Sequence, residues 1–130
     1  MAVGCEGPNI GLLKGVPVLV VEDVWHVARA LKSMLEQIGM HVIGPTATTA
    51  EARSLTAAHG PQLAIVDVNL KQETSCDLIV ELHQQGVRVV VISGYKEPAV
   101  SQGSVAAFLQ KPFSGRDLIA TIYRVLGSPC

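Results

Sequence analysis

The chain has 130 residues, which suits one domain with one hydrophobic core. Its net charge is −1, from 10 basic and 11 acidic residues without a basic cluster, so nucleic-acid binding has no electrostatic support. The longest apolar runs have about six residues, far short of the ~20 that cross a membrane, and we expect neither a membrane span nor a signal peptide.

The first 15 residues differ in composition from the rest of the chain. Glycine and proline recur there and disfavour regular structure, so residues 1–15 are predicted to be a flexible arm or linker. Residues 16–127 are predicted to form one folded domain, and residues 128–130 a short tail.

Within that domain, short aliphatic runs alternate with segments of helical character. The runs predicted as strands are, in chain order, Val18–Val21, His41–Ile43, Leu63–Val66, Val87–Ile92 and Val105–Leu109. Apolar spacing and capping motifs, such as Thr48 with Glu51 and Ser114 with Asp117, predict helices at about 28–38, 48–60, 75–86 and 114–126. Residues 95–104 are polar and contain Pro98 and Gly103, so any helix there is expected to be short.

This alternation predicts a parallel sheet with helices on both faces. The carboxyl ends of parallel strands share one edge, where such sheets hold their ligands. Polar residues follow four of the five strands at that edge: Glu22 and Asp23, Asp67, Ser93, and Lys111. Three carboxylates and one ammonium there indicate a site that holds a divalent cation and handles a phosphoryl group.

The acidic residues are candidate ligands of a hard cation such as Mg²⁺, which prefers oxygen. Glu22 and Asp23 would hold the metal, although Asp23 also suits the cap of the next helix. Asp67, as the central carboxylate, can serve both as a metal ligand and as a nucleophile toward phosphorus; the alternative is a polar turn residue. The Asn69 backbone carbonyl can complete the metal shell, unless Asn69 is an ordinary loop residue.

Three further residues are candidates for contact with the phosphoryl group. Ser93 can donate to a phosphoryl oxygen and Gly94 leaves room for it, although Ser-Gly is also a common turn pair. Lys111 offsets the negative charge, and Pro112 restricts its backbone to extended values. A cis Lys111–Pro112 bond would aim the lysine over the strand ends. Phe108, three residues before Lys111, also fits a core aromatic.

Four motifs in this order and spacing resemble the receiver domain of two-component response regulators. They are Val-Leu-Val-Val-Glu22-Asp23, Ile-Val-Asp67-Val-Asn69-Leu, Val-Ile-Ser93-Gly94 and Gln-Lys111-Pro112-Phe. The resemblance covers about residues 16–127. It implies the flavodoxin-like (CheY-like) fold, a doubly wound five-stranded parallel sheet of order 2-1-3-4-5. The 18 positions from Ser93 to Lys111 are a few fewer than usual, which implies a shortened fourth helix.

The resemblance also implies a role for each residue of the site. Asp67 would accept phosphate from a histidine kinase or histidine phosphotransfer protein. The metal, Mg²⁺ or Mn²⁺, would be bound by Glu22, Asp23, Asp67 and the Asn69 carbonyl. Ser93, Gly94 and Lys111 would recognise the phosphoryl group, Phe108 would be the switch aromatic, and Asn69 and Tyr95 would tune hydrolysis.

The expected protein is a cytoplasmic signalling switch rather than an enzyme. Its motifs resemble single-domain regulators and the C-terminal receivers of hybrid kinases, which carry a Ser- or Thr-Gly-Tyr motif. We expect no DNA-binding domain of its own after residue 127, so output is expected through a downstream protein partner, and a homodimer stays open. The alternatives are a phosphate-independent scaffold and an aspartyl phosphatase. The widely spaced Cys5, Cys76 and Cys130 predict reduced thiols rather than a zinc or redox site.

Overall fold

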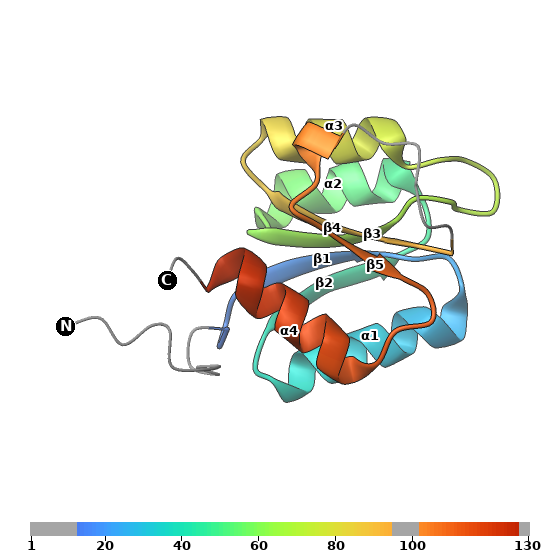
Figure 1. Ribbon diagram of the computed structural model, residues 1–130. Helices are drawn as coiled ribbons and strands as arrows, with labels where there is room; N and C mark the ends of the chain where they lie inside the picture. Colours follow the sequence, from blue (N-terminus) through green and yellow to red (C-terminus); the bar gives the residue numbers. More distant parts are fainter. Residues whose placement is uncertain (1–12, 95–101, 128–130) are drawn as a thin grey trace.

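The computed structural model describes residues 13–94 and 102–127, which fold into one five-stranded parallel sheet covered by helices (Figure 1). The strand order is β2-β1-β3-β4-β5. The strands are β1 (Pro17–Val21), β2 (His41–Thr46), β3 (Leu63–Asp67), β4 (Arg88–Ser93) and β5 (Ala107–Gln110). The helices are α1 (Trp25–Gln37), α2 (Thr49–His59), α3 (Cys76–Gln84) and α4 (Gly115–Leu126), with a 3-10 turn, η2, at Gln102–Ser104.

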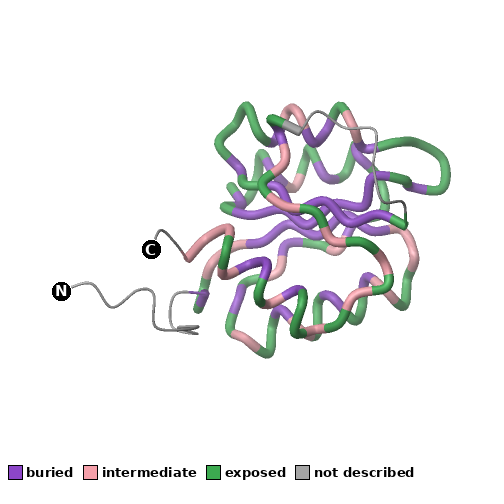
Figure 2. Tube along the Cα trace, in the orientation of Figure 1, coloured by how far each residue is buried: buried purple, intermediate pink, exposed green. Residues whose placement is uncertain are grey.

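The helices lie in two layers, with α2 and α3 on one face of the sheet and α1 and α4 on the other (Figure 1). Successive strand residues point to opposite faces, so β1 supplies Leu19 and Val21 to the core beneath α2 and α3. Its Val18 and Val20 enter the core beneath α1 and α4. The buried residues of the central strands form a continuous band between the helices (Figure 2). Burial on both faces explains why these strands read as unbroken aliphatic runs.

The expected strand order and five-stranded fold are confirmed, and the strand limits shift. β2 continues through Gly44–Pro45 to Thr46, beyond the predicted end at Ile43. Proline lacks a donor for the ladder but is tolerated on an edge strand, and β2 is one edge. β5 occupies Ala107–Gln110 rather than Val105–Leu109. It is the other edge, and its alternating exposure conceals its limits from an analysis of apolar runs.

The start of the chain and the stretch between β4 and β5 bear on two further expectations. Leu13 is fully buried in the core beneath α1 and α4, three residues ahead of the predicted start of the domain. Between β4 and β5 the structure describes one short 3-10 turn, η2, in line with the expected short helix; residues 95–101, including Tyr95, lie outside the described part. None of the helices within residues 13–94 and 102–127 is long and apolar enough to cross a membrane.

Candidate functional site

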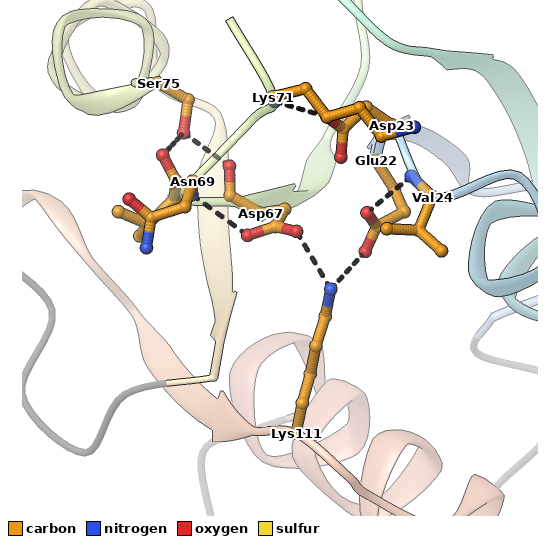
Figure 3. A network of polar contacts seen from close by, with 9 residues as sticks. Glu22, Asp23, Val24, Asp67, Asn69, Lys71, Ser75 and Lys111 are labelled. Atoms are coloured by element: carbon orange, nitrogen blue, oxygen red, sulfur yellow. Dashed lines mark hydrogen bonds and ion pairs between the residues drawn. The ribbon is translucent and has the colours of Figure 1, made fainter. Parts of the chain in front are cut away.

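Three acidic side chains meet where β1 and β3 end, as expected from the parallel topology. Glu22, Asp23 and Asp67 each offer a carboxylate oxygen, and these oxygens lie within 4.8 Å of one another. Glu22 and Asp67 are buried, with 2% and 4% of their surface exposed, whereas Asp23 is partly exposed. Figure 3 shows the three carboxylates converging on one region. So close a group of like charges is costly unless a cation lies nearby.

Each of these carboxylates accepts a hydrogen bond from a backbone N–H group. The donors are Val24 to Glu22 Oε2 at 3.0 Å, Asn69 to Asp67 Oδ1 at 3.0 Å, and Lys71 to Asp23 Oδ2. Asp23 therefore does not cap α1, whose N-cap residue is Val24 without a side-chain cap bond. The backbone holds one oxygen of each carboxylate, and Glu22 Oε1, Asp23 Oδ1 and Asp67 Oδ2 remain for other partners.

Lys111 brings an ammonium among these acids. Its Nζ lies 2.8 Å from Glu22 Oε1 and 2.9 Å from Asp67 Oδ2. Burial lowers the pKa of Lys111, but pairing with the two carboxylates outweighs burial, so its pKa lies above the ordinary value. Lys111 is therefore charged at neutral pH. It follows the carboxyl end of β5 and bridges Glu22 and Asp67 at the ends of β1 and β3.

The burial of Glu22 has the opposite consequence for its own charge. Burial raises the pKa of Glu22, and the contacts with Lys111 and the Val24 amide only partly offset this effect. The ionised form is thus short of compensating positive charge. A hard divalent cation would supply it, and the three carboxylates are the oxygen ligands that Mg²⁺ uses. The donor set therefore fits a magnesium site.

The chain that follows Asp67 forms a short hairpin from Val68 to Ser75. Its two arms pair through an antiparallel bridge between Asn69 and Thr74, flanked by Leu70 N–H to Glu73 C=O at 3.0 Å and Ser75 N–H to Val68 C=O at 3.0 Å. The fully buried Ser75 hydroxyl donates to the Asp67 carbonyl at 2.6 Å instead of capping α3. The end of β3 is thereby joined directly to the start of α3 (Figure 3).

A polar chain connects this hairpin to α2 and α3, and none of its members was singled out from the sequence. The Glu73 carboxylate accepts from the Thr49 N–H at 2.9 Å and from the Thr49 hydroxyl at 2.7 Å. Arg53 donates to the Thr49 hydroxyl at 3.3 Å and forms a two-pronged pair with Glu81 at 2.8 and 3.0 Å. Hydrogen bonding to Thr49 lowers the pKa of Glu73, which is therefore ionised at neutral pH.

The remaining predicted residues lie on β4, on β5 and in the segments that follow these strands. Ser93 is buried at the end of β4, and its carbonyl accepts from the Lys111 N–H at 2.8 Å; Gly94 beside it is exposed. The Lys111–Pro112 peptide bond is cis, in agreement with the expectation for Pro112. Phe108 is 40% exposed on the edge strand β5, so it is not the core aromatic that was left open as an alternative.

A mostly apolar groove of about 470 Å³ adjoins Lys111 on the side of α1. It is lined by His26, Val27, Ala30, Leu31, Met34, Lys111, Pro112 and Phe113. Trp25, at the start of α1, is 69% exposed, and the Arg29 guanidinium lies over its ring at 4.7 Å. Apolar surface thus lies directly beside the buried charges of the site.

Comparisons with known proteins agree with this architecture. The family model described as "Response regulator receiver domain" matches residues 18–123. The transcriptional regulatory protein PdtaR of Mycobacterium tuberculosis is 32% identical over 124 residues, covering 89% of this chain and 60% of that protein. The photosynthetic apparatus regulatory protein RegA of Rhodovulum sulfidophilum is 26% identical over 110 residues, covering 80% of this chain and 60% of that protein. The chain therefore spans about 60% of the curated relatives it matches.

Solved structures show the same fold. The response regulator PhyR from Brucella abortus matches with a TM-score of 0.76 and 23% identity, covering 90% of this chain and 50% of that chain. A response regulator receiver domain (CheY-like) from Methylobacillus flagellatus matches with a TM-score of 0.74 and 21% identity, covering 84% and 97% of the respective chains. At such identities these structures inform on the fold alone.

Proposed function

This chain belongs to the response regulator receiver domain family, and from that premise we propose that it accepts a phosphoryl group on Asp67 in the presence of Mg²⁺. The observation that carries the proposal is the position of the Asp67 carboxylate. One of its oxygens lies within 4.8 Å of oxygens of Glu22 and Asp23, and the Lys111 ammonium pairs with both Asp67 and Glu22. A carboxylate held in this way can attack phosphorus, while the Lys111 ammonium and a cation held by the acids would stabilise the transferred group.

The proposed donor is a phosphorylated histidine of a kinase or phosphotransfer protein. An Asp67 oxygen forms the new O–P bond as the N–P bond of the donor breaks, and the imidazole nitrogen keeps the bonding electron pair. Mg²⁺, bound by Glu22, Asp23, Asp67 and the Asn69 carbonyl, would neutralise charge on the phosphoryl oxygens. Lys111 and Ser93 are proposed to contact the attached phosphoryl group, for which Gly94 leaves room.

The hairpin supports the assignment of the Asn69 carbonyl. In an antiparallel bridge flanked by hydrogen bonds, the two bridge residues direct their own N–H and C=O groups away from the partner arm. The Asn69 N–H points to Asp67, and its carbonyl faces the same side. Two residues on, the Lys71 N–H points to Asp23. This direction of the backbone supports the proposal that the Asn69 carbonyl would help to hold a cation together with the carboxylates.

The groove between α1 and Lys111 is the proposed contact surface for the histidine-bearing donor. A donor must bring its phosphoryl group to Asp67, and this apolar surface is lined by the same lysine that pairs with Asp67. Exposed Trp25 extends it. The proposed output is a change in protein contacts of a cytoplasmic switch, in which Phe108 responds to the phosphoryl group and Asn69 and Tyr95 tune its hydrolysis.

The test uses a small acyl-phosphate donor, Mg²⁺ and intact-mass measurement. We expect the wild type to gain the mass of one phosphoryl group, and Asp67→Asn to gain none. A chelator should abolish the gain, and excess Mg²⁺ should restore it. No gain in the wild type at any Mg²⁺ concentration would contradict the proposal and favour a phosphate-independent scaffold. Continuous release of phosphate from small esters would favour a phosphatase.

A further inference from the structure

Besides its contacts with Asp67 and the core, the hairpin of residues 68–75 is tied to neighbouring segments by two carboxylate contacts, and only one of these uses a candidate metal ligand. Asp23 accepts the Lys71 N–H, which ties one arm of the hairpin to the loop after β1. Glu73 binds the backbone and the hydroxyl of Thr49, which ties the other arm to the start of α2. The first tether involves the proposed metal site, and the second lies apart from it.

The hairpin is too short to fix its own orientation. It contains a single bridge, and even longer isolated two-stranded hairpins are only marginally stable in water. The direction of the Asn69 carbonyl therefore depends on the contacts around the hairpin, which are the bond from the Asn69 N–H to Asp67, the buried Leu70 and these two tethers. A cation held by the Asp23 carboxylate would compete with the hydrogen bond that this carboxylate accepts from the Lys71 N–H. Glu73 makes no contact with the proposed metal ligands, so its bonds to Thr49 can hold the hairpin both with and without a bound cation.

The Thr49 end of this tether is well suited to a carboxylate. Thr49 is the first residue of α2, where backbone N–H groups have no partner within the helix and negative charge is favoured. Arg53, itself held by Glu81 of α3, donates to the Thr49 hydroxyl. That bond occupies an acceptor site of the hydroxyl, whose hydrogen is directed to Glu73.

We propose that Glu73 is a positioning residue for the metal site: by binding Thr49 at the start of α2, it fixes the hairpin that presents the Asn69 carbonyl and the Lys71 amide to the acidic group. The proposal rests on the proposed function, since it assumes that the acidic group binds Mg²⁺. It assigns Glu73 no contact with the metal or the phosphoryl group.

The test measures Mg²⁺ affinity by titration calorimetry in the full chain, with the fluorescence of Trp25, the only tryptophan, as a second readout. Glu73→Ala is expected to raise the Mg²⁺ dissociation constant about three- to tenfold, at or below the low end of losses seen when groups that orient metal ligands are removed. Glu73→Gln keeps an acceptor and a donor for Thr49 and should restore most of the affinity. The charge-matched control is Glu36→Ala, an exposed glutamate near the far end of α1, and it should bind Mg²⁺ like the wild type.

A second measurement separates positioning from a general loss of stability. The rate of phosphorylation by the acyl-phosphate donor should fall in Glu73→Ala at low Mg²⁺ and return to the wild-type rate at saturating Mg²⁺. An unchanged dissociation constant in Glu73→Ala, with Mg²⁺ binding intact in the wild type, would overturn the role of Glu73 and leave the proposed function standing. A rate that stays low at saturating Mg²⁺ would also overturn it. Absence of Mg²⁺ binding in the wild type would overturn both.

Discussion

Neutralising Glu22 should stabilise the protein when no metal is bound. In Glu22→Gln the side chain keeps its shape and can still accept from the Val24 N–H, while one of three crowded negative charges is removed. The same change should weaken Mg²⁺ binding, because it removes a proposed ligand. The two effects have opposite signs, so the presence of Mg²⁺ should decide which protein is more stable.

The expected magnitude follows from the distances in the site. At an effective dielectric constant of about 20, like charges at most 4.8 Å apart repel by at least about 3.5 kcal/mol, so Asp23 and Asp67 together oppose the charge on Glu22 by at least about 7 kcal/mol. At the same dielectric constant, the attraction between Glu22 and Lys111 at 2.8 Å stabilises the ionised carboxylate by about 6 kcal/mol. Charge interactions alone therefore disfavour ionised Glu22 slightly, and desolvation of this buried carboxylate adds to the cost.

Lys111 does not become an unpaired charge in the variant. It keeps its contact with Asp67 at 2.9 Å, and a quarter of its side chain reaches solvent. The large penalty for isolating a buried ion therefore does not apply. The lysine contact is already counted in the charge balance, so the remaining charge term of about 1 kcal/mol and the desolvation cost lead us to expect Glu22→Gln to be more stable by about 2 kcal/mol in chelator.

The assay is urea unfolding in chelator and again in Mg²⁺ at about 100 times its dissociation constant. Under the second condition, Mg²⁺ binding stabilises the wild type by about 2.7 kcal/mol, and the variant should gain little stability from Mg²⁺. The difference in stability between the two proteins should therefore shrink or change sign. Glu36→Gln, the exposed control, should stay within about 0.5 kcal/mol of the wild type under both conditions. The reasoning is wrong if Glu22→Gln is less stable than the wild type in chelator.

The same site predicts a pH dependence with a definite sign. The pKa of Glu22 is raised above its ordinary value by burial, so the folded protein binds the proton more tightly than the unfolded chain. The wild type should therefore gain stability from this group as the pH falls through the raised pKa toward the ordinary value. Glu22→Gln has no carboxyl group here to take up the proton, so the amount by which it is more stable than the wild type in chelator should shrink toward acidic pH. An advantage that grows on acidification would contradict the direction of the shift.

Three further substitutions test the local geometry by urea unfolding. Ser75→Ala removes the buried hydroxyl that donates to the Asp67 carbonyl and should cost about 1–3 kcal/mol; a neutral result would mean that the bond contributes nothing. Gly44→Ala should cost more than about 1 kcal/mol, because φ is +96° and the new Cβ would lie 2.9 Å from backbone. Gly115→Ala should stay within about 1 kcal/mol of the wild type, because its Cβ would meet only the flexible Met34 sulfur at 2.9 Å. The opposite order of the two glycine variants would refute this distinction between backbone and side-chain clashes.

The contacts of Lys111 could be predicted from the sequence because they follow from topology. Lys111 and Asp67 are 44 residues apart, but each follows a predicted strand of one parallel sheet, and such strand ends meet at one edge. Aliphatic runs and the charged residues that end them are local signals. They sufficed to place Glu22 and Asp67 beside the lysine without any knowledge of the loops.

The tethers of the hairpin could not be predicted in the same way. Glu73 and Lys71 are exposed polar residues in a segment without periodicity, where the sequence indicates only a loop. The contact between Glu73 and Thr49 spans 24 residues and depends on how the hairpin folds over the sheet edge. The one usable signal was the Thr48–Glu51 capping motif, which marks the start of α2 as a place where a carboxylate is favoured.

These contacts define how a charge change at Asp67 would reach the rest of the protein. Through Ser75 the end of β3 is joined to α3, and through the hairpin and Glu73 it is joined to α2. Neither connection involves the Asp67 oxygen that binds Lys111. A phosphoryl group on Asp67 would change the partners of Lys111 first, and the Lys111 N–H is bonded to the Ser93 carbonyl across β4 and β5. Under the proposed function, α2 and α3 would act as the fixed side of the site, and the ends of β4 and β5 as the side that moves.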